Sequence, residues 1–427
     1  MIRSLWISKT GMDAQQSQLD VISNNLANVN TTGFKRSRAV FEDLLYQNVR
    51  EPGAQSSQQT TLPSGMQIGT GTRIVATERL HTQGNLQQTG NSTDVAINGN
   101  GFFRMQDKDG GIFYTRNGQF KLDENRNLTN MQGLQLTGYP AAGSPPTIQQ
   151  GANPVPLSIP EGMMNAKAST SGEMVTNLKS THKVPENKTF DPTKQDSYNY
   201  VNTITAYDSL GNAHNINAYF VKTDDNKWQV YTQDGSAAPV NAGTMEFSTS
   251  GNLVKTTSTN GAPGEFSMVI PMTAKDGAPA QNFTLSFAGS MQQNVGSDSV
   301  SKVAQDGYAA GEYTNFQINN DGTVVGIYSN QQTQVLGQIV MANFSNPEGL
   351  ASQGDNVWQE TGASGQPRVG LSGGGGFGKL TSGALESSNV DLSQELVNMI
   401  VAQRNYQSNA QTIKTQDSIL QTLVSLR

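Results

Sequence analysis

Cysteine is absent from this chain of 427 residues, and charged residues are scarce, at 15% of the total. The absence of cysteine would be somewhat unusual in a cytosolic protein of this size, whereas in an exported protein it removes the risk of mispaired disulfides. No run of 18 apolar residues occurs, which excludes a membrane-spanning helix.

A basic patch is missing as well. The formal net charge is -6, and the longest Lys/Arg cluster, Lys35, Arg36 and Arg38, is followed by Glu42 and Asp43. These features argue against a nucleic-acid partner. We predict that the cluster forms a solvated turn.

The residue types that carry catalysis are few and scattered. None of the three histidines, His81, His182 and His214, has a His or Cys partner at metal-ligand spacing. No G-x-S-x-G turn marks a nucleophile, and the glycine-rich stretches lack the Lys-Ser/Thr pair of a phosphate loop. We therefore predict no enzyme activity, no cofactor and no metal site.

The N-terminus does not resemble a cleavable secretory signal. Arg3 and Lys9 bracket only a few apolar residues, and Asp13 follows. Together with the absence of cysteine, this pattern hints at export by a route that does not cleave the chain.

Both ends of the chain carry apolar residues at coiled-coil spacing, which predicts helices over residues 2–28 and 391–427. Ser8 and Gln15 interrupt the first stripe, and Gln403 and Asp417 the second. The two helices could simply pair inside a monomer, or each narrow stripe could require several helical neighbours in a polymer. The polar interruptions favour the polymer, and the predicted subunit-packing residues are Leu5, Met12, Leu19, Ile22, Leu26, Leu392, Leu396, Met399, Tyr406, Ile413, Leu420 and Val424.

Between the helices the sequence is typical of short β-strands separated by Asn-Gly and Asp-Gly turns. The predicted fold class is α+β and mainly β, with terminal helices forming a coiled-coil-like inner layer and an outer β domain inserted into an inner one. A further short helix is predicted over residues 34–46. The expected divisions are the N-terminal helix at 1–33, a linker with an extended segment at 34–71, the inner β domain at 72–145 and 308–385, the outer β domain at 146–307, and the C-terminal helix at 386–427.

Several motifs resemble those of bacterial flagellar rod and hook proteins. The N-terminal signature is NNLANV at residues 24–29 followed by GFK at 33–35, and the C-terminal one is SNVD at 388–391 followed by ELVNMI at 395–400. From about residue 101 onward the chain resembles hook proteins, notably in SQGDNVW at 352–358. Before that point, residues 42–47, 51–69 and ATERL at 76–80 are more similar to distal rod proteins.

This resemblance implies a non-enzymatic subunit that polymerises with itself into a hollow helical tube and transmits torque from motor to filament. The implied partners are rod and hook–filament junction proteins, a hook cap during assembly, and the flagellar type III export apparatus. The implied location is the flagellar basal body or hook, outside the cell. In the free monomer we expect the terminal helices to be largely disordered, because an isolated helix without its packing partners is marginal.

The rod-like linker suggests a strut that lodges between subunits and straightens the polymer. Its predicted residues are Tyr46, Glu51, Pro52, Gln55, Pro63 and Gly69. A straight distal-rod-type subunit, or a hybrid of rod and hook, is therefore the main alternative function. A surface-binding β module would explain the Asn- and Thr-rich strands, but not the two terminal stripes.

Overall fold

The computed structural model describes residues 2–50, 55–57, 60–61 and 66–425. It divides the chain into two units. The first contains Met1–Pro160, Phe316–Gly326 and Gln334–Arg427, and the second contains Glu161–Asn315 and Ile327–Thr333.

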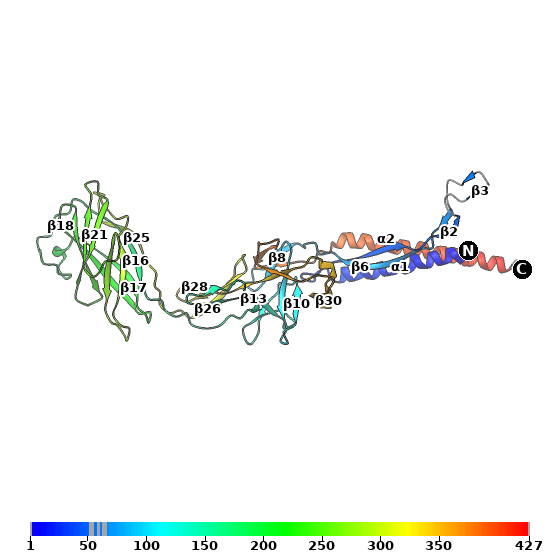
Figure 1. Cartoon of the computed structure of the whole chain (residues 1–427), viewed down its shortest axis with the longest axis horizontal. Helices are drawn as coiled ribbons and strands as arrows, with labels where there is room; N and C mark the ends of the chain where they lie inside the picture. Colours follow the sequence, from blue (N-terminus) through cyan, green and yellow to red (C-terminus); the bar gives the residue numbers. More distant parts are fainter. Residues whose placement is uncertain (1, 51–54, 58–59, 62–65, 426–427) are drawn as a thin grey trace. The chain divides into compact units, whose positions relative to one another are not determined.

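Two long helices form one part of the first unit. α1 (Ile2–Ala27) and α2 (Leu392–Ser425) pack side by side, with the two chain termini at the same end of the pair (Figure 1). Asp391 caps α2, because its carboxylate accepts a hydrogen bond from the backbone N–H of Gln394 at 3.1 Å. Both predicted helices are confirmed. Pairing within one chain, the simpler of the two arrangements considered, is present in the structure. The expected disorder of these ends in the free monomer stays a prediction.

The short helix predicted over residues 34–46 is wrong. The segment forms strand β1 (Ser37–Asp43), which pairs antiparallel with β6 (Thr72–Arg79). Cross-strand charge pairs, Arg38 with Glu78 and Arg73 with Glu42, favour this register. The resulting ribbon packs against α1, as Figure 1 shows for β6.

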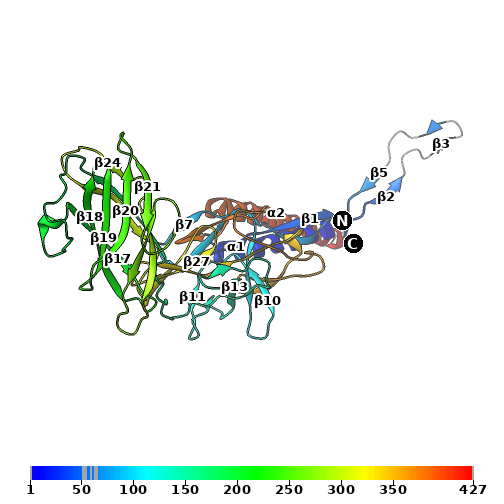
Figure 2. The same ribbon diagram turned by 60° about the vertical axis from the view of Figure 1, so that its left-hand side comes forward.

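The linker predicted at 34–71, with its extended or loop-like segment, contains two short antiparallel strand pairs. Strand β2 (Gln47–Arg50) pairs with β5 (Met66–Ile68), and β3 (Gln55–Ser57) pairs with β4 (Thr60–Thr61). The segment therefore doubles back as a hairpin, whose stem leaves the helices near the N-terminal end of α1 (Figure 2).

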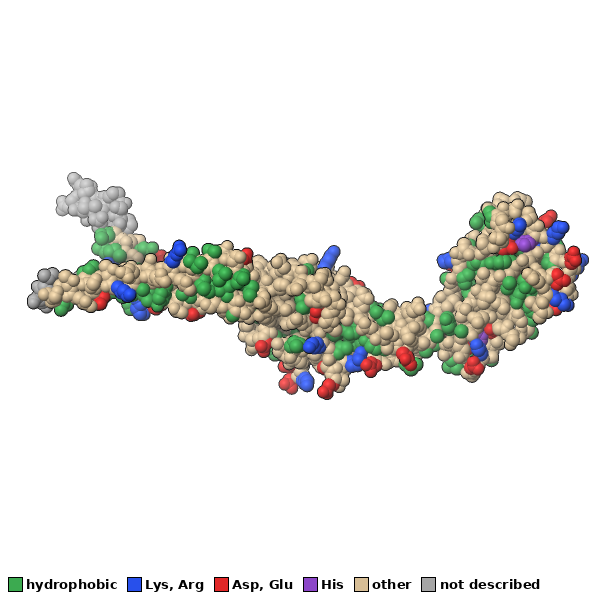
Figure 3. All heavy atoms as spheres, turned by 180° about the vertical axis from the view of Figure 1, so that it is seen from behind, with side chains coloured by type: hydrophobic (Ala, Val, Ile, Leu, Met, Phe, Trp, Pro, Cys, Tyr) green, Lys and Arg blue, Asp and Glu red, His purple; other side chains and the backbone are tan. Residues whose placement is uncertain are grey.

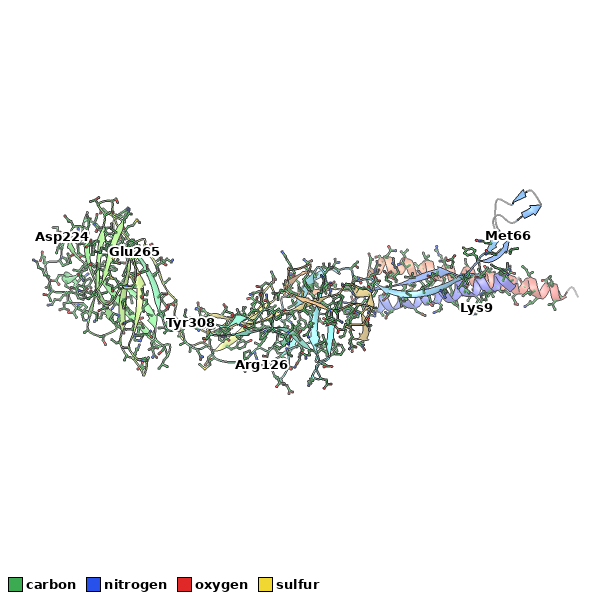
Figure 4. All side chains as sticks on the ribbon, viewed as in Figure 1. Lys9, Met66, Arg126, Asp224, Glu265 and Tyr308 are labelled. Atoms are coloured by element: carbon green, nitrogen blue, oxygen red, sulfur yellow. The ribbon has the colours of Figure 1, made fainter. Side chains whose placement is uncertain are left out.

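The remainder of the first unit is a β domain whose main path runs from β28 (Thr333–Ile339) through β13, β9, β10 and β31 to β30. Its aromatic core contains Phe102, Tyr114, Phe344 and Trp358, packed edge to face. Arg126 lies in this domain (Figure 4). The strands are β7 (Leu86–Gln88), β8 (Val95–Asn98), β9 (Phe102–Gln106), β10 (Ile112–Thr115), β11 (Lys121–Leu122), β12 (Leu128–Thr129), β13 (Gln135–Ala142), β14 (Thr147–Ile148), β15 (Val155–Pro156), β29 (Met341–Asn343), β30 (Ala351–Gly354), β31 (Val357–Gln359), β32 (Arg368–Gly370), β33 (Lys379–Ser382) and β34 (Ala384–Glu386).

The domain boundary predicted at residue 146 lies too early. Strands β14 and β15 both pair with β13, so the chain stays in the first unit until Pro160. The prolines in this stretch suggested a linker, but Pro156 lies in β15 and is paired with Thr137 of β13. Farther on, β26 (Tyr313–Ile318), β27 (Thr323–Tyr328) and β28 (Thr333–Ile339) occupy the stretch in which the chain passes from the second unit back to the first.

The second unit is a sandwich of two five-stranded sheets, one of which runs β17-β18-β19-β20-β21. Its core is built around Trp228, whose indole N–H donates to Gln292 at 2.7 Å, and includes Phe220 and Phe283. The elements are β16 (Ser171–Leu178), η1 (Gln195–Ser197), β17 (Tyr200–Tyr207), β18 (Ala213–Asp224), β19 (Lys227–Asp234), β20 (Val240–Phe247), β21 (Leu253–Ser258), β22 (Ser267–Met272), β23 (Gln281–Ser286), β24 (Met291–Gln292) and β25 (Ser299–Gln305). Within the described residues, neither helix of the chain is long and apolar enough to cross a membrane.

The two ends of this sandwich lie next to each other. Met164 bridges to Gly311, and Lys167 bridges to Tyr308 (Figure 4). Asp306 stabilises this junction of the two ends, because its carboxylate accepts hydrogen bonds from the backbone N–H groups of Thr170 and Ser171, each at 2.9 Å.

Because this core is self-contained, we expect a fragment of residues 161–315 to fold alone. Urea unfolding followed by Trp228 fluorescence should give one cooperative transition. A fragment whose fluorescence shows no transition would mean that the sandwich depends on the rest of the chain.

Candidate assembly interface

A buried ionic cluster joins the two ends of the chain to the β domain of the first unit. The ammonium of Lys35 lies 2.5 Å from one carboxylate oxygen of Glu386, and the guanidinium of Arg116 lies 3.1 Å from the other. The Lys35 and Glu386 side chains are fully buried. Our prediction that Lys35 belongs to a solvated turn is therefore wrong.

Further hydrogen bonds pair other polar atoms of this cluster, whereas Arg116 Nε is buried without a partner among the described residues. Lys35 also donates to the Thr82 carbonyl at 2.7 Å, and Arg116 donates to the Gly99 carbonyl at 2.8 Å. Burial lowers the pKa of Lys35, with Glu386 opposing that shift and Arg116 adding to it. Burial likewise lowers the pKa of Arg116, and Glu386 opposes it. Glu386 is the one carboxylate that both cations share, so its charge holds the cluster together.

Two asparagines of the terminal motifs fix the backbone around the cluster. Asn25 accepts from the Ser37 N–H at 2.9 Å and donates to the Ser37 carbonyl at 2.8 Å. Asn389 accepts from the Arg36 N–H at 2.7 Å and donates to the Leu80 carbonyl at 2.8 Å. These bonds give the NNLANV and SNVD motifs a physical role, which is to set the directions of both helices.

Glycine at position 33 is required by the same packing. Gly33 has a φ of +71°, and a Cβ there would lie 2.8 Å from the backbone of Arg116 and Asn117. Its N–H donates to the Glu386 carbonyl at 2.8 Å. A side chain at this position would therefore push the N-terminal segment away from the cluster.

The structure distributes the predicted subunit-packing residues over three environments. Ile22 is buried, and Leu392, Leu396 and Val424 are exposed. The half-buried members are Leu5, Met12, Leu19, Leu26, Met399, Tyr406, Ile413 and Leu420. The predicted interruption Ser8 is itself buried, so small size rather than polarity governs its position.

Close approach of the helices explains why small residues occur on the packed side. A Cβ at Gly11 would lie 2.8 Å from the Asn409 side chain, and Ala14 and Ala402 are buried. Pairing therefore covers one side of each helix and leaves other apolar residues in solvent.

The sequence analysis missed a second apolar face on α2. Val397, Ile400 and Val401 are between 49% and 55% exposed, next to the exposed Leu396. Hydrophobic side chains gather visibly along the helical part of the first unit (Figure 3). The signal was present in ELVNMIV at 395–401, where apolar residues occupy more than one side of the helix.

The hairpin is anchored to α1 at its base. Arg3 donates to the Gln47 side chain at 2.5 Å, and the Thr72 N–H donates to the Thr10 hydroxyl at 3.4 Å. Met66 begins β5, on the returning strand of the hairpin (Figure 4). Leu45, just before this base, and Val49 and Met66, on the hairpin strands, expose their side chains.

The predicted strut residues are only partly described. Tyr46 is exposed, and a Cβ at Gly69 would lie 3.7 Å from its ring. Gln55 begins β3. Glu51, Pro52 and Pro63 lie outside the described residues.

Among the residues that the structure describes, no group of three or more acidic or histidine side chains is arranged to hold a metal ion. His214 is instead enclosed by Asp234, at 2.8 Å, and Asp208, at 3.3 Å, inside the second unit. The features that stand out are packing surfaces, not reactive groups.

We expect Glu386→Gln to lower the free energy of unfolding of the first unit by about 3–5 kcal/mol, because it leaves two buried cations without a counter-charge. Glu124→Gln, on an exposed turn, is the control and should change it by less than about 0.5 kcal/mol. Urea unfolding followed by circular dichroism measures both. Equal effects would show that the cluster does not hold the unit together.

Four family models match consecutive parts of the chain. They are the flagella basal body rod protein (residues 6–35), the flagellar hook protein FlgE/F/G D1 domain (96–176), the flagellar basal body protein FlaE D2 domain (177–308) and the flagellar basal body rod FlgEFG protein C-terminal (381–426). The crystal structure of Helicobacter pylori flagellar hook protein FlgE2 gives a TM-score of 0.51 at 16% identity, covering 70% of this chain and 100% of that one. That likeness shows the fold alone.

Full-length relatives give the family. The flagellar hook protein FlgE of Salmonella typhimurium is 54% identical over 423 residues, and that of Escherichia coli K12 is 53% identical over 421, each covering 98% of both chains. The flagellar basal-body rod protein FlgG of Buchnera aphidicola subsp. Acyrthosiphon pisum is 35% identical over 428 residues, covering 100% of both. This chain therefore belongs to the flagellar hook protein FlgE family and is a structural subunit of the hook.

Proposed function

We propose that the chain polymerises with itself into a hollow helical tube that transmits torque as a flexible joint, with the exposed apolar face of α2 as its main contact. The observation that supports this contact is that four apolar side chains of α2 remain in solvent although α1 and α2 are paired, namely Leu396, Val397, Ile400 and Val401. Contiguous exposed apolar residues of this kind mark an interaction surface.

A contact between two different surfaces of the subunit can be repeated from one subunit to the next. If the α2 face of one subunit packs against a different surface of the next, the contact does not close on itself and generates a helical polymer. The half-buried stripe residues, Met399 and Ile413 among them, would then be covered completely by neighbouring helices. The tube's channel would be lined by the exposed polar side of the helices.

The remaining parts of the proposal follow from the family. The subunit would leave the cell through the flagellar type III export apparatus without a cleaved signal, assemble under a hook cap, and contact rod and hook–filament junction proteins at the ends of the tube. We propose no catalytic activity.

A straighter, rod-like polymer is the second candidate, and the hairpin is the observation that favours it. The segment from β2 to β5 projects from the helical region and exposes Val49 and Met66. We propose that it lies between neighbouring subunits as a strut, fixing their axial spacing and opposing the length changes that bending requires.

We expect Ile400→Asp to prevent polymerisation, because the assembled state would bury a carboxylate among apolar groups, at a cost of several kcal/mol. Gln411→Asp, on an exposed polar part of the same helix, is the matched control and should assemble normally. Light scattering of the full chain at increasing concentration measures assembly. Normal assembly of Ile400→Asp, with its helices intact by circular dichroism, would exclude this face as the contact.

We expect deletion of residues 47–68 to make the polymers more curved, because the spacing between subunits is no longer fixed. The deletion is compatible with folding, since the Thr70 hydroxyl donates to the Leu45 carbonyl at 2.8 Å and the Leu44 N–H donates to the Gly71 carbonyl at 2.9 Å. Electron microscopy of negatively stained polymers measures curvature. An unchanged shape would remove the strut from the account.

A further inference from the structure

The composition of strand β6 is typical of a strand inside a sheet, although β6 lies at the edge of a two-stranded ribbon. It pairs with β1, and no other described strand pairs with either of them. Residues 73–77 are all exposed, with Ile74 at 37% and Val75 at 49%. An uninterrupted exposed run includes both faces of a strand, and apolar β-branched residues in such a run are typical of strands with a neighbour on each side.

Two contacts with α1 show which backbone groups of the ribbon point away from the facing strand. The Asn25 side chain bonds both backbone groups of Ser37, at 2.8 and 2.9 Å. The Thr10 hydroxyl accepts from the Thr72 N–H at 3.4 Å. Ser37 on β1 and Thr72 on β6 therefore direct these groups outward, and α1 occupies one outward position on each strand.

The next outward positions carry no such contact. Inward and outward pairs alternate along an antiparallel ladder, so the pairs Ala39–Thr77 and Phe41–Ile74 also direct their backbone groups outward. No described side chain makes a hydrogen bond to the backbone of these residues. Each strand of the ribbon therefore has an edge with unpaired donors and acceptors, which is the kind of edge that accepts a further strand.

The outward edge of β1 adjoins open space. A hollow of about 330 Å³ lies where β1 meets both helices, and Arg38 and Ala39 line it together with Gln394 and Asn398 of α2. Because the outward edges of β1 and β6 lie on opposite sides of the ribbon, one chain can pair with two neighbours at once.

The charges along the ribbon select the strand that fits the free edge of β6. Within the chain Arg38 faces Glu78, and Glu42 faces Arg73. A second β1 on the free edge, in the same register, would repeat both charge pairs without placing like charges opposite each other. We propose that β1 of a second copy of the chain pairs antiparallel with the free edge of β6.

This strand pairing rests on the proposed self-assembly and specifies one of its contacts. Since β1 and β6 contribute different edges, the contact does not close on itself, and each copy can receive one neighbour and pair with the next. Pairing of β6 with β6 of the second copy would also match opposite charges. That contact is symmetric, however, and would end at a dimer.

Cysteine cross-linking of the full chain tests the pairing, because the chain has no cysteine of its own. Chains carrying Ala39→Cys are mixed with chains carrying Thr77→Cys and oxidised under polymerising conditions. The two positions would face each other across the contact with Cα atoms about 5.5 Å apart, a separation that a disulfide spans. We expect disulfide-linked dimers from the mixture on non-reducing electrophoresis, and none from either variant alone.

Two further mixtures complete the experiment. Ala39→Cys mixed with Glu124→Cys, on an exposed turn, is the control and should give no dimers. Dimers from Ile74→Cys mixed with Thr77→Cys would instead show β6 paired with β6 and would overturn the proposal.

Sedimentation of the same samples measures polymer separately from the cross-link. Polymer without a cross-link between positions 39 and 77 would overturn the strand pairing and leave the proposed tube standing. Cross-linked dimers without polymer would support the strand pairing and contradict the tube. Absence of the cross-link at every concentration would overturn the pairing.

A backbone variant tests the same edge without a cross-link. Thr77→Pro removes the outward N–H, which the pairing with β1 of the same chain does not use, whereas Thr77→Ala keeps it. We expect Thr77→Pro to raise the concentration needed for polymerisation about tenfold, and Thr77→Ala to change it less than about twofold. Equal effects of the two variants, with unchanged circular dichroism, would overturn the proposal. The cross-linking experiment decides if Thr77→Pro does not fold.

Discussion

The shared carboxylate of Glu386 is the constraint on which the arrangement of the first unit depends. It lies between two cations from distant parts of the sequence, Lys35 after α1 and Arg116 after β10. Burying three charges is costly unless each is paired and hydrogen-bonded. The bonds to the Thr82 and Gly99 carbonyls add to the two ion pairs and leave Arg116 Nε as the buried cluster atom without a partner among the described residues. A partly formed cluster would leave a buried charge unpaired and would be less stable than no cluster at all. The cluster therefore joins the helices to the β domain in an all-or-none manner.

The surface left for assembly follows from the way the ionic cluster fixes the helices to the β domain. With both helix directions set at the cluster, α1 and α2 pair through small residues such as Gly11 and Ala402. None of the described residues covers the wider apolar side of α2, which stays exposed. A single chain therefore pairs the charges of the buried cluster but leaves the apolar side of α2 in solvent. The uncovered part can be buried only by another molecule, which is the physical basis for a polymer-forming subunit.

The sequence predicted what depends on local spacing. Coiled-coil spacing placed both helices, and the turn-rich middle indicated a mainly β chain. It could not reveal that Lys35 is buried, because its partner Glu386 is 351 residues away in the chain. It also mistook strand β1 for a helix, since the apolar residues of 34–46 fit both periods and the pairing with β6 decides between them. On α2, a search for one stripe overlooked Val397, Ile400 and Val401, which lie on another side of the same helix.

Electron cryo-microscopy of the polymer formed by the unmodified chain tests the central claim most directly. We expect a hollow tube in which the helical part of each subunit faces the channel and Val397, Ile400 and Val401 contact neighbouring subunits. A polymer held together only by its β domains, with this face of α2 still in solvent, would contradict the account.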